Sequence, residues 1–280
     1  MVKLTLCNEV LRDHDFREQC RLAAALGYDG LEVAPFTLSE DPATISSSDR
    51  QTLRQTAEDH GLSITGLHWL FLTPSGLSLT SDDPETVRRT RSHIEALIDL
   101  CADLGGKVLI HGSPQQRMLS DASSPEHARD TALEHLHTAG ELCVEADATY
   151  CIEPLAPHLT DFVNTVAEAV KLIEEAGSAG LATMLDTLAA WNGEAQAPET
   201  VLDQWLGTGR IAHIHFNDTN SQAPGQGDRN FADILATLQE HRYSGYVGIE
   251  PFKYEPSGVA AAACAAGYLR GLEDAGRAAP

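Results

Sequence analysis

The sequence predicts an α/β fold, a single (β/α)8 barrel that spans residues 1–280. Eight short apolar runs recur along the chain, and each is followed by a segment with helical spacing or a helix-start signal. No low-complexity linker or abrupt change of composition divides the chain, and its length suits one barrel. A doubly wound open sheet is the alternative, but no GxGxxG motif follows any of the runs.

Four strands and four helices are expected in the first half of the chain. The expected strands are 2–7, 30–34, 63–68 and 107–111. The expected helices are 13–26, 48–60, 83–104 and 125–146. Gly27 marks the end of the first helix, because glycine adopts the left-handed backbone of a helix C-terminus without strain. Asp83 and Pro84 mark the start of the third helix, since acids and proline both suit a first turn.

The second half repeats the pattern, and each apolar run there ends in a residue able to bind a metal. The runs are 148–153, 181–186, 211–215 and 246–250. The helices are expected near 161–175, 198–206, 231–241 and 258–273. The runs end in Glu153, Asp186, His215 and Glu250, which are 33, 29 and 35 residues apart. Each interval suits one strand, one helix and two connections.

These four residues predict a metal site at one end of the barrel. Parallel α/β folds place their chemistry at the carboxyl ends of the strands. A buried carboxylate without a partner is costly, so three acids and an imidazole that converge there indicate a shared cation. This mostly oxygen donor set suits Mn²⁺, or else Mg²⁺ or Co²⁺, better than structural zinc. The alternative is that each acid caps a helix or simply ends its strand.

Residues around the strand ends are candidates for contact with a sugar, because aromatic and imidazole rings can stack on its apolar face and bond its hydroxyls. The candidates at the second, third and fourth strands are Glu32, His68, Trp69 and His111. Arg117 could hold an anionic group of the substrate. Asp218 lies in the turn-rich loop 217–228, which is expected to form part of the pocket lip. For each, rim packing or a surface position is the alternative.

Charge and cysteine content narrow the class of protein. The formal net charge of −22 repels phosphate backbones and anionic membranes, so no nucleic-acid or membrane partner is expected. The six cysteines are scattered without a CxxC pair, which is typical of reduced thiols in a cytoplasmic protein. The N-terminal apolar stretch is too short for a signal peptide, and no run approaches a membrane span.

Five motifs carry a resemblance to a known family. They are CIEPL (151–155), MLDT (184–187), HIHFND (213–218), PGQG (224–227) and GIEPF (248–252). The chain resembles the ketose 3-epimerases, which act on sugars such as tagatose and allulose, in the xylose-isomerase-like TIM barrel superfamily. The resemblance implies that Glu153, Asp186, His215 and Glu250 hold a divalent ion, usually manganese, magnesium or cobalt. It also implies that Glu153 and Glu250 exchange the substrate proton.

The chemistry explains why two glutamates are needed. An ion that binds the carbonyl oxygen and a neighbouring hydroxyl of a ketose acidifies the C–H between them and stabilises the resulting enediolate. One carboxylate then removes the proton, and a second returns a proton to the opposite face. Return to the same carbon inverts it, whereas return to the adjacent carbon gives aldose–ketose isomerisation, so both outcomes stay open.

Three positions depart from the family pattern. Ala189 stands where these epimerases carry a histidine, Ser221 where they carry an arginine, and Leu159, beside His158, where they carry a glutamate. His158 is therefore a further substrate-contact candidate. A modified sugar, such as a phosphorylated sugar, a keto-glycoside or a polyol derivative, is expected in place of a free ketohexose.

Other activities remain as alternatives. The same site could catalyse metal-assisted elimination from an oxidised sugar, or the chain could be a non-catalytic sugar-binding subunit. The DNA-cutting endonuclease branch of the superfamily is disfavoured by the net charge of −22. Relatives are often dimers or tetramers, so a homo-oligomer is also expected by analogy.

Overall fold

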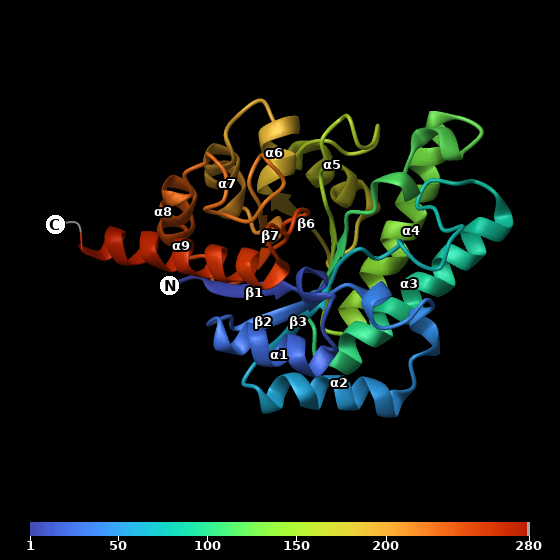
Figure 1. Cartoon of the computed structure of the whole chain (residues 1–280). Helices are drawn as coiled ribbons and strands as arrows, with labels where there is room; N and C mark the ends of the chain where they lie inside the picture. The colour runs from blue at the N-terminus through green and yellow to red at the C-terminus, as the bar shows by residue number, and fades with distance from the viewer. Residues whose placement is uncertain (279–280) are drawn as a thin grey trace.

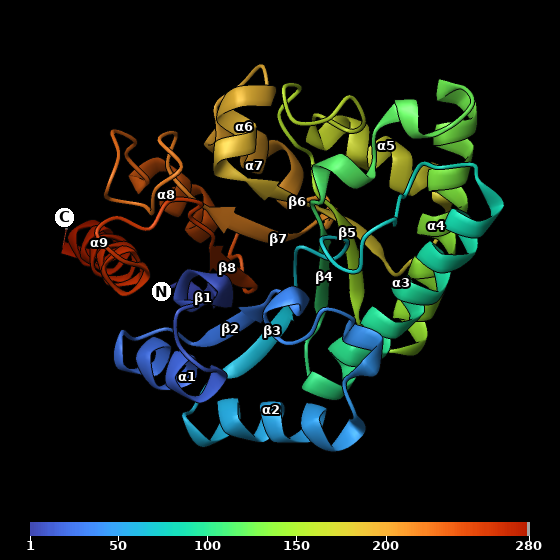
Figure 2. The ribbon, with the colours of Figure 1, turned by 45° about the vertical axis from the view of Figure 1, so that its right-hand side comes forward.

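The computed structural model describes residues 1–278, and its eight parallel strands close into a barrel (Figures 1 and 2). Each strand pairs with its sequence neighbours, and β8 pairs with β1 to complete the ring. The strands are β1 (Lys3–Cys7), β2 (Gly30–Val33), β3 (Ser63–Leu67), β4 (Val108–His111), β5 (Thr149–Ile152), β6 (Leu181–Asp186), β7 (Ile211–Phe216) and β8 (Tyr246–Ile249). The predicted barrel is therefore confirmed, and the open sheet is wrong.

Helices follow every strand and surround the barrel (Figure 2). They are α1 (Phe16–Ala25), α2 (Ser47–Asp59), α3 (Pro84–Leu104), α4 (Pro125–Glu145), α5 (Val166–Ala176), α6 (Thr187–Gly193), α7 (Pro198–Leu206), α8 (Ala232–Glu240) and α9 (Gly258–Ala278). The sequence did not predict α6, which begins directly after β6. No described helix combines the length and the apolar character that crossing a membrane requires.

Side-chain caps set several helix boundaries. Asp83 accepts a hydrogen bond from the backbone N–H of Thr86 at 2.9 Å, and Pro84 follows as the first residue of α3. Gly27 has φ 84°, as expected for a residue just after a helix end. The helix expected from residue 161 begins only at Val166, because Thr165 accepts a hydrogen bond from Glu168 N–H and caps it there.

The core lies in two regions because strand side chains alternate between the two faces of the barrel wall. The larger region packs the strands against the helices and includes Leu6, Leu67 and Tyr150. The smaller region is formed by Ile110, Cys151, Ala182 and Met184, which come from three neighbouring strands. Cys151 and Met184 each lie two residues before an acid, so those acids follow on the same face as this smaller region.

The two ends of the described chain lie together, since the N-terminus runs beside α9 (Figure 1). Val2 donates its N–H to Glu273 at 2.6 Å, and Arg270 donates to the carbonyl of Val2 at 2.7 Å. These contacts fix the start of β1 against the last helix, at the end of the barrel away from the strand carboxyl ends.

Candidate metal centre

The four residues predicted to bind a metal meet at the carboxyl ends of β5 to β8. One ligand atom from each of Glu153, Asp186, His215 and Glu250 lies within 4.8 Å of all the others. The backbone ladder positions the two glutamates just past their strands, since Glu153 N–H bonds to His111 and Glu250 N–H to Phe216. Their exposed fractions are 0 to 6%, which places the four groups below the surface of the barrel mouth.

His215 is oriented by carboxylates on both ring nitrogens. Nδ1 lies 3.0 Å from Glu250 Oε2, and Nε2 lies 2.8 Å from Glu32 Oε1. Burial disfavours the charged ring, but Glu32 and Glu250 raise the pKa of His215 well above its ordinary value. With its Nε2–H donated to Glu32, the ring could present Nδ1 to a cation, an arrangement common in histidine metal ligands.

Three carboxyl groups share the buried space around His215. Burial, then the charges of Glu250 and Asp186, raises the pKa of Glu153 well above its ordinary value. Burial and Glu250 raise the pKa of Asp186 to about 7. Like charges this close cannot all ionise in a buried space without a compensating cation. Three carboxylates and one imidazole therefore fit a divalent ion, which would relieve this repulsion.

Asp186 is held by two neighbours. Its Oδ1 accepts a hydrogen bond from Ala189 N–H at 2.7 Å, so Asp186 caps α6. Its Oδ2 accepts one from Asn217 Nδ2 at 2.8 Å, and the same amide group also reaches the carbonyl of Glu250. The helix-cap alternative thus applies to Asp186, yet the same carboxylate faces the other three groups. Asn217 was not predicted, although its place two residues after His215 puts it on the same face.

Glu32 lies deeper than the sequence suggested. It is fully buried, with Oε2 2.7 Å from His213 Nε2 and Oε1 against His215. His213 packs beside His215, with ring centroids 4.9 Å apart, and Glu32 supports the two imidazoles instead of facing the mouth. Gly248 makes room for them, because a Cβ there would lie 2.6 Å from His215 Cδ2.

His68 forms a second buried group with residues of the first strand. Its Nε2 lies 2.9 Å from Glu9 Oε2. Burial alone would lower the pKa of His68, but Glu9, with smaller effects of Glu32 and Glu250, raises it to about 9. Glu9 follows β1 in a short 3-10 helix, and ligand atoms of Cys7, Glu9, His68 and Glu250 lie within 4.8 Å of one another. Glu9 was missed, although an acid just after a strand is the signal that identified Glu153.

Trp69 lies at the rim of the site. Its ring packs edge-on against Phe252, with centroids 6.2 Å apart, and Phe252 is 44% exposed. Trp69 has φ 53°, a conformation uncommon for a residue with a side chain and often found at functional sites. Its indole Nε1 is buried without a hydrogen-bond partner in the described chain, so it could donate to a substrate.

His111 and Arg117 are both buried near the β4 end of the site. His111 Nδ1 lies 2.8 Å from the Tyr150 hydroxyl, and the ring packs on Phe71 with centroids 4.4 Å apart. Tyr150 and Phe71 belong to the helix-facing core, so His111 is directed at the outer side of the wall. Burial and the charge of Arg117 lower the pKa of His111 well below its ordinary value.

The remaining candidates lie outside this cluster. His158 is exposed in a turn, beside Leu159, which is 44% exposed. Asp218 is buried, but it accepts hydrogen bonds from the backbone N–H groups of Thr219 and Arg229. Asp218 thereby closes the loop 217–228 on itself, so its carboxylate has a structural task.

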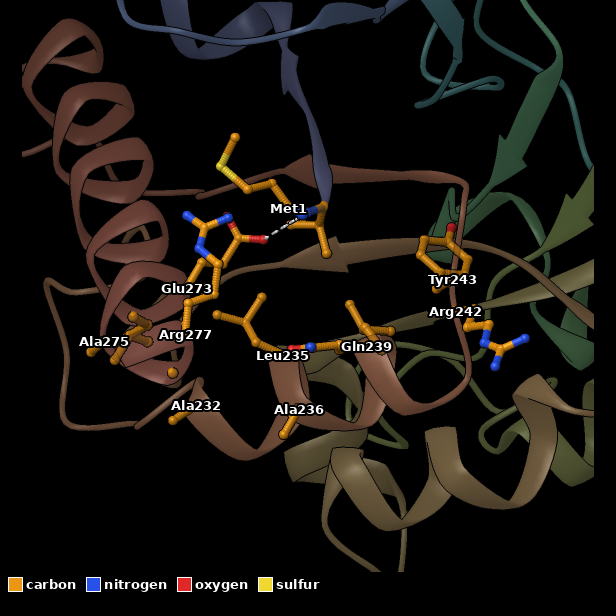
Figure 3. Close-up of a pocket in the computed structure, with 14 residues that line it drawn as sticks. Met1, Ala232, Leu235, Ala236, Gln239, Arg242, Tyr243, Glu273, Ala275 and Arg277 are labelled. Carbon is orange, nitrogen blue, oxygen red and sulfur yellow. Dashed lines mark hydrogen bonds and ion pairs between the residues drawn. The ribbon is translucent and has the colours of Figure 1, made fainter. Parts of the chain in front are cut away.

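A pocket of about 430 Å³ lies elsewhere, between α8, α9 and the start of β1 (Figure 3). Its charged lining includes Glu273, which pairs with the N-terminal amine at 3.9 Å, and Arg242. It contains no residue predicted for the site, and it lies at the end of the barrel opposite the strand carboxyl ends. The buried cluster of four, and not this hollow, is therefore the candidate centre.

Comparisons with known proteins agree with this fold. A family model described as "Xylose isomerase-like TIM barrel" matches residues 20–272. A D-psicose 3-epimerase of Enterocloster bolteae is 26% identical over 242 residues, which cover 85% of this chain and 77% of that protein. A D-psicose 3-epimerase of Agrobacterium fabrum is 26% identical over 235 residues, which cover 82% and 76%.

A solved structure is similar as well. The structure of an L-ribulose 3-epimerase matches with a TM-score of 0.83 at 20% identity, covering 99% of this chain and 96% of that one. At this identity the likeness bears on the fold. The two sequence relatives are epimerases by name, which agrees with the isomerase class expected from the sequence.

Proposed function

The chain belongs to the xylose isomerase-like TIM barrel family, and on this premise we propose that it is a divalent-metal-dependent sugar epimerase or isomerase. The observation that carries the proposal is the convergence of Glu153, Asp186, His215 and Glu250 within 4.8 Å. The epimerase relatives support the same class of reaction. Mn²⁺ is the preferred ion, with Mg²⁺ or Co²⁺ as alternatives, because the donor set is mostly oxygen.

Each residue has a defined task in this proposal. A bound divalent ion would polarise the carbonyl and a neighbouring hydroxyl of the sugar and so acidify the C–H between them. Glu153 removes that proton, and Glu250 delivers a proton to the opposite face. The two glutamates follow β5 and β8, strands separated by two others, so they can approach the substrate from different sides. Asp186 and His215 hold the ion.

The surrounding residues act by positioning. Asn217 fixes the carboxylate of Asp186, and Glu32 fixes the ring of His215. Trp69, at the rim, contacts the sugar through its ring face and its free N–H.

The cytoplasmic location, a homo-oligomeric state and the substrate contacts of His158 and Asp218 stay predictions.

The test is proton exchange with solvent. The Mn²⁺-loaded protein is incubated in D₂O with a panel of ketoses and keto-sugars, and deuterium next to the carbonyl is followed by NMR. We expect incorporation in the wild type, loss after metal chelation, and recovery when Mn²⁺ is returned. Glu153→Gln should abolish incorporation, whereas the control Glu95→Gln, on the exposed face of α3, should not.

The metal content of Glu153→Gln must be measured in the same samples, because Glu153 is also a ligand candidate. Exchange retained by a metal-replete Glu153→Gln protein would refute Glu153 as the base. Release of water or an aglycone in place of an epimer would favour elimination. Sugar binding by the metal-replete wild type without any exchange would favour the non-catalytic alternative.

A further inference from the structure

Arg117 is a fully buried cation without a partner. Its exposed fraction is 0%, and it is the largest side chain in the described chain with under 2% exposure. Nε, Nη1 and Nη2 all lack a hydrogen-bond partner among the described residues. A guanidinium carries five N–H donors, and burying them unpaired is among the costlier arrangements in a protein.

This group lies beside the proposed catalytic base. Arg117 lies in the connection between β4 and α4, directly after the 3-10 helix Pro114–Gln116, and that connection begins at Gly112. Gly112 packs against the Glu153 carboxylate so closely that a Cβ there would lie 2.2 Å from Oε2. The charges of Arg117 and Glu153 also act on each other: Glu153 partly offsets the burial that lowers the pKa of Arg117 to about 10. The guanidinium therefore stays protonated at neutral pH.

Arg117 is not explained as a counter-ion for Glu153. A structural counter-ion would form a salt bridge, yet no carboxylate of the described residues approaches within 4.0 Å of the Arg117 guanidinium. The unpaired guanidinium near Glu153 indicates that an oxyanion completes the site.

We propose that Arg117 binds a carboxylate of the substrate, so that the substrate is a sugar acid or keto-acid and not a neutral ketose. A planar carboxylate matches the fork of a guanidinium with two parallel hydrogen bonds. A phosphate would bring up to two negative charges into a buried region that holds the three acids Glu153, Asp186 and Glu250, and Arg117 is the only buried arginine among the described residues.

The substrate class follows from this pairing and rests on the proposed epimerase or isomerase function.

The experiment compares ligands that differ in one group. Calorimetry with the Mn²⁺-loaded protein measures Kd for D-fructose, for D-fructuronate, which has a terminal carboxylate, and for fructose 6-phosphate. The wild type should bind the carboxylate at least about tenfold more tightly than the neutral sugar. Arg117→Met, which fills the buried space without charge, should lose that preference and give similar Kd values for the two ligands. Arg117→Lys should keep part of it.

The outcomes separate this inference from the proposed reaction. Equal affinities in the wild type, or a preference that survives in Arg117→Met, would overturn the carboxylate site, and tighter binding of the phosphate would overturn the choice of anion. If Arg117→Met does not fold, unchanged preference in Arg117→Lys is the contradicting result, since a lysine cannot form the paired contact. Arg117-dependent binding without deuterium exchange would refute the reaction and leave the anion site standing.

Discussion

The carboxylate of Glu32 lies 2.8 Å from Nε2 of His215, the ring nitrogen that faces away from Glu250. The two residues are 183 positions apart in the sequence, on β2 and β7. The contact favours a proton on Nε2, so that Nδ1, which lies 3.0 Å from Glu250 Oε2, could bind a cation placed between them. Glu32 is thus placed to orient the imidazole of His215.

Glu32→Gln should weaken metal binding while leaving the fold intact. Loss of a supporting carboxylate behind a histidine ligand typically costs about 10- to 100-fold in metal affinity. Titration of the metal-free protein with Mn²⁺ by calorimetry measures the change. Glu95→Gln, an exposed substitution on α3, is the control and should bind as the wild type does. Equal affinity in Glu32→Gln would contradict the supporting role.

Gly248→Ala should displace His215 and lower both metal affinity and stability. The added Cβ would lie 2.6 Å from His215 Cδ2 and 3.2 Å from His213 Nε2, so the rings must move. Gly267→Ala in α9 is the matched control, since no described atom lies within 4 Å of its new Cβ, and it should stabilise by up to about 1 kcal/mol. Denaturant unfolding and Mn²⁺ titration compare the two proteins. Unchanged metal binding in Gly248→Ala would show that the imidazole position is not critical.

Trp69→Phe should raise KM for the substrate by up to about tenfold with little effect on kcat. The substitution keeps the aromatic contact with Phe252 but removes the buried, unpartnered indole N–H. Steady-state kinetics on the substrate found by the exchange screen measure this change. Trp205→Phe in α7, away from the barrel mouth, is the control. A KM equal to that of the wild type would mean that the Trp69 N–H does not contact the sugar.

His135 should make the protein lose stability as the pH falls from about 6.5 to about 4. Burial, with a smaller effect of Arg91, lowers the pKa of His135 from 6.5 to about 4. In this window the unfolded chain takes up a proton that the folded chain does not, so the free energy of unfolding falls. This loss of stability is absent above pH 6.5 and complete below the pKa of the folded state. The difference corresponds to about 3 kcal/mol.

Urea unfolding at pH 7.5, 5.5 and 4.5 tests this pH dependence. His135→Leu removes the titrating group, so its stability should fall less steeply over the window than that of the wild type. His127→Gln, an exposed substitution in α4, should follow the wild type. Parallel curves for all three proteins would exclude His135 as the source.

Side-chain direction was harder to predict than element order. Glu32 was expected at the mouth, but the pairing of β2 with β3 shifts register between Leu31 and Glu32, and the carboxylate points to the buried imidazoles. His111 was expected beside the substrate, but it is directed toward Tyr150 in the helix-facing core. The direction of such side chains depends on the register between neighbouring strands. The sequence of a single strand does not specify that register.

The sequence by itself determined the barrel, the order of its strands and the four residues that end β5 to β8. These follow from local periodicity and from the similar intervals between strand ends, both of which can be read along the chain. Only the tertiary structure decided that Glu32 supports His215, that Glu9 pairs with His68, and that Arg117 is buried without a hydrogen-bond partner among residues 1–278. The reason is that each of these relationships joins strands or loops far apart in sequence, and barrel closure and register alone set the distance between them.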